Sequence, residues 1–290
     1  MRLSLCNEVI RELPFERQCA MAAELGYAGL ELAPFTLGEE AYRMPAGDRA
    51  LVRGACAAAG IAVSGLHWLL VAPAGLSITS ADAAVRERTL DVMRRLVGLC
   101  ADLDGSYLVH GSPAQRRVDG DPDAPRRAEE AFAAIAEEAR AAGVVYCVEP
   151  LAPPEADFVT TLAEAAALVR RIENPALKTM LDTSAAGLAE SEPVPALIER
   201  WMPTGLLAHV QLNDRNRRGP GQGEDAFAPI LAALKRTGYD GWLAMEPFQY
   251  VPDGPTCAAR AVGYVAGILE TLEARFSWAQ ASARPAAGGP

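Results

Sequence analysis

The chain has 290 residues, of which 50% are hydrophobic and 22% are charged, so it can bury one large core or two modest ones. Its formal net charge of −10 argues against a nucleic-acid partner, because phosphate binding needs clustered lysine and arginine side chains. No apolar segment reaches the length of a membrane span, and acids in the N-terminal MRLSLCNEVIREL are untypical of a signal peptide, so we expect no membrane partner and a soluble, cytoplasmic protein.

Short apolar strands alternate with helical segments along the chain. We predict eight strands, at 2–6, 30–34, 61–68, 106–110, 144–150, 178–182, 206–211 and 242–247. The clearest helices are predicted at 82–103, which opens on a capping Asp82, and at 124–142. Helical runs end before a strand at a glycine, which adopts the left-handed conformation of a helix end, at Gly26, Gly60, Gly143 and Gly238.

Strands that alternate with helices predict βαβ units and a parallel sheet. Eight such units in about 250 residues have the size of a (β/α)8 TIM barrel, so we expect an α/β fold with a single barrel domain over 1–276. A doubly wound open sheet is the alternative, but no Gly-x-Gly-x-x-Gly follows the first strand, and we expect no nucleotide cofactor. The Ala/Gly/Pro-rich segment 277–290 is expected to be a disordered C-terminal tail.

The cysteines show no CxxC pair and lie mostly in apolar or alanine-rich runs. This usage favours reduced core thiols over a disulfide or zinc framework. They are Cys6, Cys19, Cys56, Cys100, Cys147 and Cys257.

All histidines and three acids lie at or near the ends of predicted strands, where a parallel barrel places its functional groups. The histidines are His67, His110 and His209, and the acids are Glu149, Asp182 and Glu246. Converging acids repel one another unless a cation neutralises them, so the pattern favours a divalent metal.

Each of these residues also has a structural interpretation. A single acid at a strand end can cap a helix or join an ion pair, and His67 and His110 can be core histidines. Glu31, inside a strand, can be a polar contact in the barrel interior or a site residue, so it is left outside the candidate set. Trp68 and the loop LLVAPAGL that follows can form a wall of a substrate pocket or seal the barrel rim.

Four motifs in the second half, CVEPLAPPEADFVTT, MLDTS, HVQLNDRNRRGPGQG and AMEPF, resemble the xylose-isomerase-like superfamily of sugar isomerases and epimerases. The resemblance is strongest to ketose 3-epimerases and hydroxypyruvate isomerase. It implies a divalent metal, Mn²⁺ or Mg²⁺, and a small carbohydrate substrate. It implies metal ligands at Glu149, Asp182, Gln211 and Glu246.

The resemblance also implies substrate-binding residues. Glu155 and Arg217 match two substrate-binding positions of the epimerases, and His209 matches the first histidine of their His-x-His motif. Gln211 stands where the epimerases have the second histidine, and the His-x-Gln pattern is that of hydroxypyruvate isomerase. A further substrate-binding histidine of the epimerases is replaced by Ala185, which speaks against a simple ketohexose 3-epimerase.

Residues 209 and 211 are two apart and therefore face the same side of a strand. Gln211 offers a neutral oxygen, which with three carboxylates makes an all-oxygen site suited to Mn²⁺ or Mg²⁺. If His209 is the ligand instead, the metal preference loosens and the chemistry is unchanged.

The expected activity is isomerisation or epimerisation through a metal-stabilised enediolate, with Glu149 and Glu246 as the acid and base. His67, His110, His209, Glu155 and Arg217 are expected to bind the substrate. One alternative is a lyase that resembles inosose or dehydroshikimate dehydratases, and another is a sugar-binding subunit without turnover. A homodimer or homotetramer is expected as the assembly.

Overall fold

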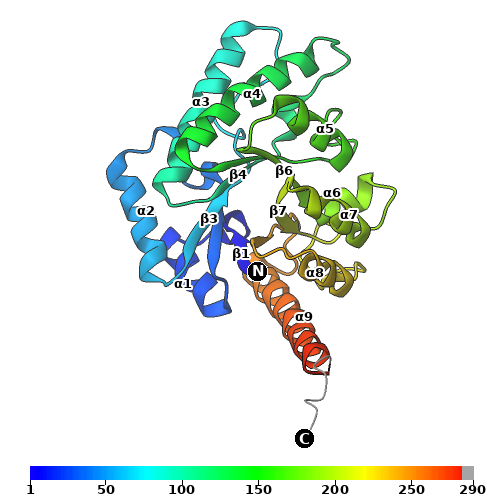
Figure 1. Ribbon diagram of the computed structural model, residues 1–290. Helices are drawn as coiled ribbons and strands as arrows, with labels where there is room; N and C mark the ends of the chain where they lie inside the picture. Colours follow the sequence, from blue (N-terminus) through cyan, green and yellow to red (C-terminus); the bar gives the residue numbers. More distant parts are fainter. Residues whose placement is uncertain (283–290) are drawn as a thin grey trace, which may run out of the picture.

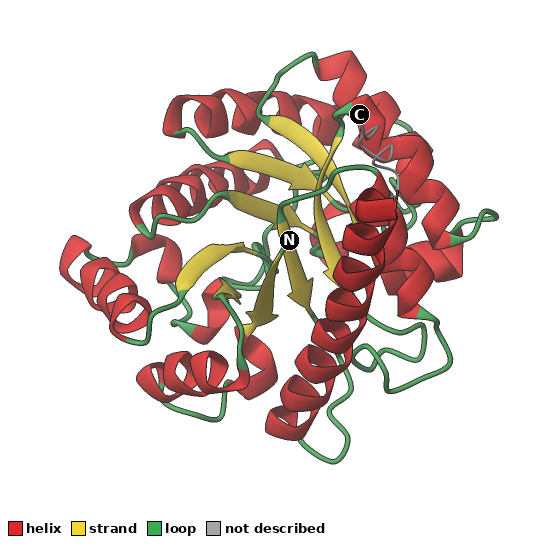
Figure 2. Cartoon of the chain, turned by 60° about the horizontal axis from the view of Figure 1, so that its bottom comes forward, coloured by secondary structure: helices red, strands yellow, loops and turns green. Residues whose placement is uncertain are grey.

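The computed structural model describes residues 1–282, with side chains described as far as residue 274. Eight parallel strands form a closed barrel in chain order, each hydrogen-bonded to its neighbours (Figures 1 and 2). The strands are β1 (Arg2–Cys6), β2 (Gly29–Leu32), β3 (Ala62–Leu66), β4 (Tyr107–His110), β5 (Val145–Val148), β6 (Leu177–Asp182), β7 (Leu207–Leu212) and β8 (Trp242–Met245). The predicted (β/α)8 TIM barrel is confirmed.

Helices surround the barrel on its outside, as Figure 2 shows in red around the yellow strands. They are α1 (Phe15–Leu25), α2 (Ala46–Ala58), α3 (Ala83–Asp102), α4 (Ala124–Ala142), α5 (Leu162–Ile172), α6 (Thr183–Ala189), α7 (Val194–Trp201), α8 (Phe227–Arg236) and α9 (Gly254–Ser282). Asp82 caps α3 by accepting a hydrogen bond from the backbone N–H of Ala84 at 2.9 Å, as predicted. A short 3-10 turn, η1 (Asn7–Ile10), follows β1.

The barrel interior is filled by alternate residues of each strand, and two glycines make room for its largest side chains. A Cβ added to Gly29 would lie 2.8 Å from the Trp242 ring. One added to Gly65 would lie 2.6 Å from the ring of Tyr107. Trp242 and Tyr107 pack there with Val109, Cys147 and Met180. The opposite faces of the strands pack against the helices in the main hydrophobic core.

Helix α9 passes the position where the sequence analysis started a disordered tail. Its backbone is helical to Ser282. The rest of that tail, 283–290, lies outside the described residues, and the domain boundary at 276 stays a prediction.

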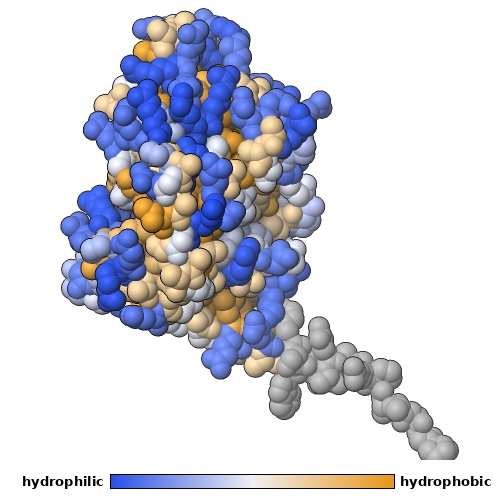
Figure 3. All heavy atoms as spheres, turned by 90° about the vertical axis from the view of Figure 1, so that its left-hand side faces the viewer, coloured by the Kyte–Doolittle hydropathy of each residue, from blue (hydrophilic) through white to orange (hydrophobic). Residues whose placement is uncertain are grey.

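All six cysteines are buried and free, as expected for reduced core thiols. Among residues 1–282, no helix combines the length and apolar character that crossing a membrane requires. On the face shown in Figure 3, hydrophilic residues are interspersed with smaller groups of hydrophobic ones.

Candidate active site

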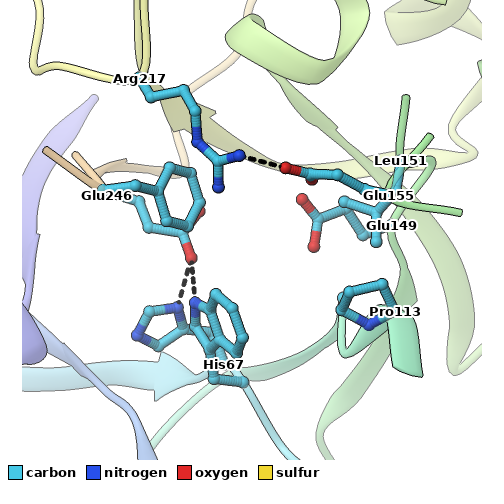
Figure 4. Close-up of a pocket in the computed structure, with 10 residues that line it drawn as sticks. His67, Pro113, Glu149, Leu151, Glu155, Arg217 and Glu246 are labelled. Carbon is cyan, nitrogen blue, oxygen red and sulfur yellow. Dashed lines mark hydrogen bonds and ion pairs between the residues drawn. The ribbon is translucent and has the colours of Figure 1, made fainter. Parts of the chain in front are cut away.

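A cavity of about 260 Å³ opens at the carboxyl ends of the strands (Figure 4). Its polar lining comes from four different strand-end loops, because the barrel brings the ends of all strands to one face. The lining residues are His67, Trp68, Gly111, Pro113, Glu149, Leu151, Glu155, Arg217, Glu246 and Phe248. Of the nine residues proposed from the sequence, five line this cavity: His67, Glu149, Glu155, Arg217 and Glu246.

Glu246, directly after β8, is held by two side chains of the β3 end. Its Oε1 lies 2.9 Å from Nδ1 of His67 and accepts a hydrogen bond of 2.9 Å from Nε1 of Trp68. The other ring nitrogen of His67, Nε2, lies 2.9 Å from Oε2 of Glu8. Oε2 of Glu246 is buried and has no hydrogen-bond partner among the described residues. One oxygen of Glu246 is therefore fixed, and the other is available to a ligand.

Glu149, directly after β5, lies across the cavity from Glu246 (Figure 4). Its carboxylate lies against the backbone of Gly111, where an added Cβ would overlap Oε2 of Glu149. The guanidinium of Arg116 in the same loop is fully buried and acts electrostatically on Glu149. Because glycine leaves this space open, the loop after β4 determines where the Glu149 carboxylate lies.

Asp182 ends β6 and has two functions in the fold. Its Oδ1 accepts a hydrogen bond from the backbone N–H of Ala185 at 2.6 Å and so caps α6, while its Oδ2 accepts one from Nδ2 of Asn213 at 2.5 Å. Asp182 also lines a smaller cavity of about 40 Å³ together with Glu149, Glu155 and Arg217. The helix-cap interpretation of this acid thus holds, and the residue still reaches the site.

On β7, His209 and Gln211 both face the barrel interior, as their spacing predicts, but neither lines the main cavity. Nε2 of His209 lies 2.9 Å from Oε2 of Glu31, and its ring stacks on Tyr107 with the centroids 3.9 Å apart. Nε2 of Gln211 donates a hydrogen bond of 2.6 Å to Oε1 of Glu31. Oε1 of Gln211 is buried without a partner among the described residues.

The pKa values of the three strand-end acids are all raised. Burial is the largest cause for Glu149, followed by Glu246 and Asp182, and the pKa lies well above its usual range. Burial and then Glu246 raise the pKa of Asp182 to about 8. Burial raises the pKa of Glu246 to about 7, although His67 opposes the shift. Glu246 thus acts electrostatically on both Glu149 and Asp182.

The pKa values of two neighbouring groups shift so that the charged form of each is favoured. Burial disfavours the charged form of His67, but Glu8 and Glu246 outweigh it and raise the pKa of His67 well above its usual range. Burial also disfavours the carboxylate of Glu31, but His209, His67 and Tyr107 lower its pKa to about 2. His67 and Glu31 are thus held in their charged forms next to Glu246 and Gln211.

Arg217 lies at the mouth of the cavity and connects three loops. Its side chain forms an ion pair with Glu155 (Figure 4), and its guanidinium lies 4.8 Å from the centroid of the Phe248 ring. Its backbone carbonyl accepts hydrogen bonds of 2.9 Å from the N–H groups of Phe248 and Gln249. Arg217 also adopts a φ of 68°, a left-handed conformation that the surrounding turn must maintain.

His110 does not line the cavity, and its side chain contacts none of the other proposed site residues. Its side chain faces the helices, with Nδ1 2.7 Å from the hydroxyl of Tyr146 and its ring against Phe132 of α4. Burial and then Arg116 lower its pKa to about 3. Tyr107 and Val109 of β4 face the interior, so the alternation along the strand turns His110 outward.

The residues proposed as metal ligands suit a divalent cation. Three acids with raised pKa values are accompanied by two buried oxygens, on Gln211 and Glu246, that lack partners among the described residues. All four side chains offer oxygen, the ligand that Mn²⁺ and Mg²⁺ prefer. Among the described residues, the His, Cys, Asp and Glu ligand atoms that lie within 4.8 Å of one another are those of Cys6, Glu8, His67 and Glu246, but His67 already uses both ring nitrogens on Glu8 and Glu246.

Several residues that contact the site are not among the nine proposed from the sequence. Glu8 follows β1 by two positions and obeys the same strand-end rule as the proposed acids, so that rule would have found it. Glu31 stands outside the candidate set, because the sequence leaves open whether it is a polar contact in the barrel interior or a site residue. For Arg116, in the 3-10 helix Pro113–Arg116, and for Phe248, in the loop after β8, the sequence carries no comparable signal.

Residues 19–267 match the family described as xylose isomerase-like TIM barrel, which confirms the resemblance of the strand-end motifs. A D-psicose 3-epimerase from Ruminiclostridium cellulolyticum is 29% identical over 178 residues, which cover 59% of this chain and 59% of the relative. The chain thus spans less than two thirds of the length of that relative.

Two further comparisons extend over nearly the whole chain. A putative hydroxypyruvate isomerase from Streptomyces coelicolor is 28% identical over 293 residues, covering 95% of this chain and 94% of the relative. The structure of an L-ribulose 3-epimerase superimposes with a TM-score of 0.81 at 24% identity, over 98% of this chain and 99% of the other. The structural likeness concerns the fold.

Proposed function

The chain belongs to the xylose isomerase-like TIM barrel family, and we propose that it is a divalent-metal-dependent isomerase or epimerase of a small ketose, aldose or sugar acid. The names of its relatives, ketose 3-epimerases and a hydroxypyruvate isomerase, support this class of reaction. The single observation that carries the proposal is the position of Glu149 and Glu246 on opposite sides of one small cavity (Figure 4).

In this mechanism the two glutamates move the protons. A substrate carbon between them presents one face to each carboxylate. One carboxylate removes the proton from the carbon beside the carbonyl, and the other returns a proton. Return to the opposite face of the same carbon inverts that centre. Return to the neighbouring carbon, together with transfer of the hydroxyl proton from one substrate oxygen to the other, interconverts an aldose and a ketose. Acid and base groups positioned in this way contribute roughly 10²–10⁴-fold to the rate.

Other side chains orient the substrate and the carboxylates. Arg217 and Glu155 are placed to hydrogen-bond substrate hydroxyls at the cavity mouth, and Trp68 and Phe248 provide apolar walls. His67 fixes Oε1 of Glu246. We assign His209 to the support of this site from below, because it contacts Glu31 rather than the cavity, and His110 to the packing of α4.

Glu149, Asp182, Gln211 and Glu246 would hold the cation, and Mn²⁺ or Mg²⁺ suits these oxygen ligands better than Zn²⁺. When bound, it would stabilise the negative charge that develops on the carbonyl oxygen as the neighbouring carbon loses its proton.

The proposal is tested by incubating the protein with Mn²⁺ and a panel of ketoses, tetronates and inososes in D₂O, followed by NMR. The expected result is a product that carries deuterium at the carbon beside the carbonyl, without loss of water. Loss of water would instead assign the chain to the lyases. Sugar binding without turnover, unaffected by a chelator, would identify a binding subunit.

The same preparation tests two further expectations. Sedimentation or light scattering would show whether the chain forms the expected homodimer or homotetramer. Activity with Mn²⁺, Mg²⁺ and Zn²⁺, each added to chelator-treated protein, would establish which metal the site prefers.

A further inference from the structure

The barrel interior holds a buried carboxylate that contacts one of the proposed cation ligands. Glu31 on β2 is fully buried, and each of its oxygens has a partner from another strand. Oε1 accepts the 2.6 Å hydrogen bond from Nε2 of Gln211, and Oε2 accepts one from the hydroxyl of Tyr107 and lies 2.9 Å from Nε2 of His209. Gln211 and Tyr107 thus donate hydrogen bonds to Glu31, and a ring nitrogen of His209 lies close to it.

This arrangement leaves the amide of Gln211 one orientation. If the amide were reversed, its oxygen would lie 2.6 Å from a carboxylate oxygen, and two acceptors at that distance repel each other. The N–H group must therefore face Glu31, and the carbonyl oxygen must face the other way. That oxygen is buried and has no partner among the described residues.

Gln211 is next to one of the other proposed ligands in the sheet. Gln211 pairs with Asp182 in the register of β6 and β7, at the carboxyl ends of both strands. Glu31 also lies 3.6 Å from Nδ1 of His67, the nitrogen that contacts Glu246. Glu31 thus contacts Gln211, the proposed ligand on β7. It also lies close to His67, which holds the proposed ligand that follows β8.

The other candidate ligand on β7 is less well placed. His209 is 1% exposed, its Nε2 faces Glu31, and its ring is stacked on Tyr107. To reach a cation at the strand ends, His209 would have to leave both contacts. Gln211 already has a free oxygen.

We infer that Glu31 is a positioning residue that fixes the Gln211 amide with its carbonyl oxygen toward the cation, so that Gln211 and not His209 is the β7 ligand. The inference rests on the proposed function, because it concerns the cation of that site. Residues that orient metal ligands from behind typically change metal affinity 10–100-fold when they are replaced.

The experiment is a Mn²⁺ titration of the chelator-treated full chain, with free Mn²⁺ measured by electron paramagnetic resonance. We expect Glu31→Gln to raise the Kd for Mn²⁺ by about 10–100-fold, because an amide at this position can accept or donate and no longer dictates the orientation of Gln211. The matched control is Ser4→Ala, in the same buried polar layer. Ser4 contacts Ser64 at 2.8 Å and has no hydrogen bond to Gln211. The Kd of the Ser4→Ala protein for Mn²⁺ should therefore stay within about twofold of wild type.

A double substitution separates positioning from a general structural effect. Gln211→Met keeps the side-chain length and removes the ligand oxygen. If Glu31 acts through Gln211, Glu31→Gln should cause little further loss of Mn²⁺ affinity in the Gln211→Met background. An equal loss in both backgrounds, or a Glu31→Gln protein that binds Mn²⁺ like wild type, overturns the inference.

If Glu31→Gln does not fold, Gln211→Asn replaces it. That variant keeps the amide group and leaves the charge of Glu31 unchanged, but its side chain is one methylene too short to contact Glu31 and the cation together. We expect it to bind Mn²⁺ at least tenfold more weakly. Unchanged affinity overturns the inference. Wild-type protein that binds no Mn²⁺ would overturn the proposed metal dependence as well. Wild-type binding with an unaffected Glu31→Gln variant overturns only the role of Glu31, and an unaffected Gln211 variant overturns the role of Gln211 as a ligand but not the metal dependence.

Discussion

Nδ1 of His67 lies 2.9 Å from Oε1 of Glu246, so a residue at the end of β3 fixes a carboxylate at the end of β8. The two residues are 179 positions apart in the chain and meet because the barrel closes. The contact occupies one oxygen of Glu246 and leaves the other without a partner among the described residues. The geometry of Glu246 is therefore set by its neighbours before any ligand binds.

Glu246→Gln is expected to lower kcat by at least about 10²-fold, because an amide cannot accept the substrate proton. The fold should persist, since glutamine has the same shape and can still accept a hydrogen bond from Trp68 through its oxygen. Turnover measured by NMR, together with the melting temperature, tests this. An undiminished rate would refute the proposed mechanism.

His67→Gln is expected to lower kcat about tenfold with little change in KM, because Glu246 loses the partner that fixes its Oε1. Trp68→Phe is the comparison, since it removes the second hydrogen bond to the same oxygen and keeps an aromatic wall. If both variants raise KM and leave kcat intact, these residues bind substrate rather than position Glu246.

Arg217→Ala is expected to raise KM about 10–100-fold and to change kcat only a few-fold, because its side chain lines the cavity and is paired with Glu155 rather than with either of the two glutamates that move protons (Figure 4). Arg218→Ala is the matched control, since Arg218 carries the same charge in the same loop and does not line the cavity. Steady-state kinetics on the substrate identified by the NMR screen separate the two parameters. A loss confined to kcat would contradict this role.

Gly111→Ala is expected to lower activity at least tenfold, because the added Cβ would overlap Oε2 of Glu149 and displace the carboxylate. Gly98→Ala in α3 is the control, since a Cβ there meets no atom within 4 Å. That change should leave activity intact and stabilise the helix by about 0.5–1 kcal/mol. Equal activity of both variants would show that Glu149 does not depend on the space at Gly111.

The stability of the cation-free protein is expected to fall as pH rises. Burial raises the pKa of Asp182 to about 8 and that of Glu246 to about 7, from ordinary values of 3.8 and 4.5. Between these limits the native state holds more protons than the unfolded chain, so the free energy of unfolding decreases with increasing pH. A bound divalent cation would neutralise the ionised carboxylates and so restore the free energy of unfolding that is lost at high pH.

Thermal unfolding of chelator-treated protein measures the effect. The melting temperature should be lower at about pH 8 than at about pH 5, and added Mn²⁺ should raise it more at the higher pH. A larger effect of Mn²⁺ at the lower pH would contradict this account of the acids.

The strand-end acids could be predicted from the sequence because the signal is local. Glu149 and Glu246 each follow an apolar strand, and Asp182 ends one. In a parallel barrel all strand ends meet at one face, so three local observations suffice to bring these acids together. The spacing of His209 and Gln211 likewise predicts their shared side of β7.

The direction of His110 could not be predicted in the same way. Strands buried on both faces show no alternation of polar and apolar residues, so the sequence does not reveal which residues face the interior. Register shifts at Leu30/Glu31 and Thr179/Met180 change the alternation between neighbouring strands as well. Only the closed barrel shows that Tyr107 faces the interior and His110 faces α4.

The sequence by itself determined the barrel, the strand-end acids and the resemblance of the motifs, because each depends on residues that are neighbours in the chain. The tertiary structure decided which residues support those acids. Glu31 and Gln211 are 180 positions apart. A buried carboxylate is tolerated only where surrounding groups donate hydrogen bonds to it or carry a compensating charge. Those donors come from strands on different sides of the barrel, so closure of the sheet is the step that brings them to Glu31.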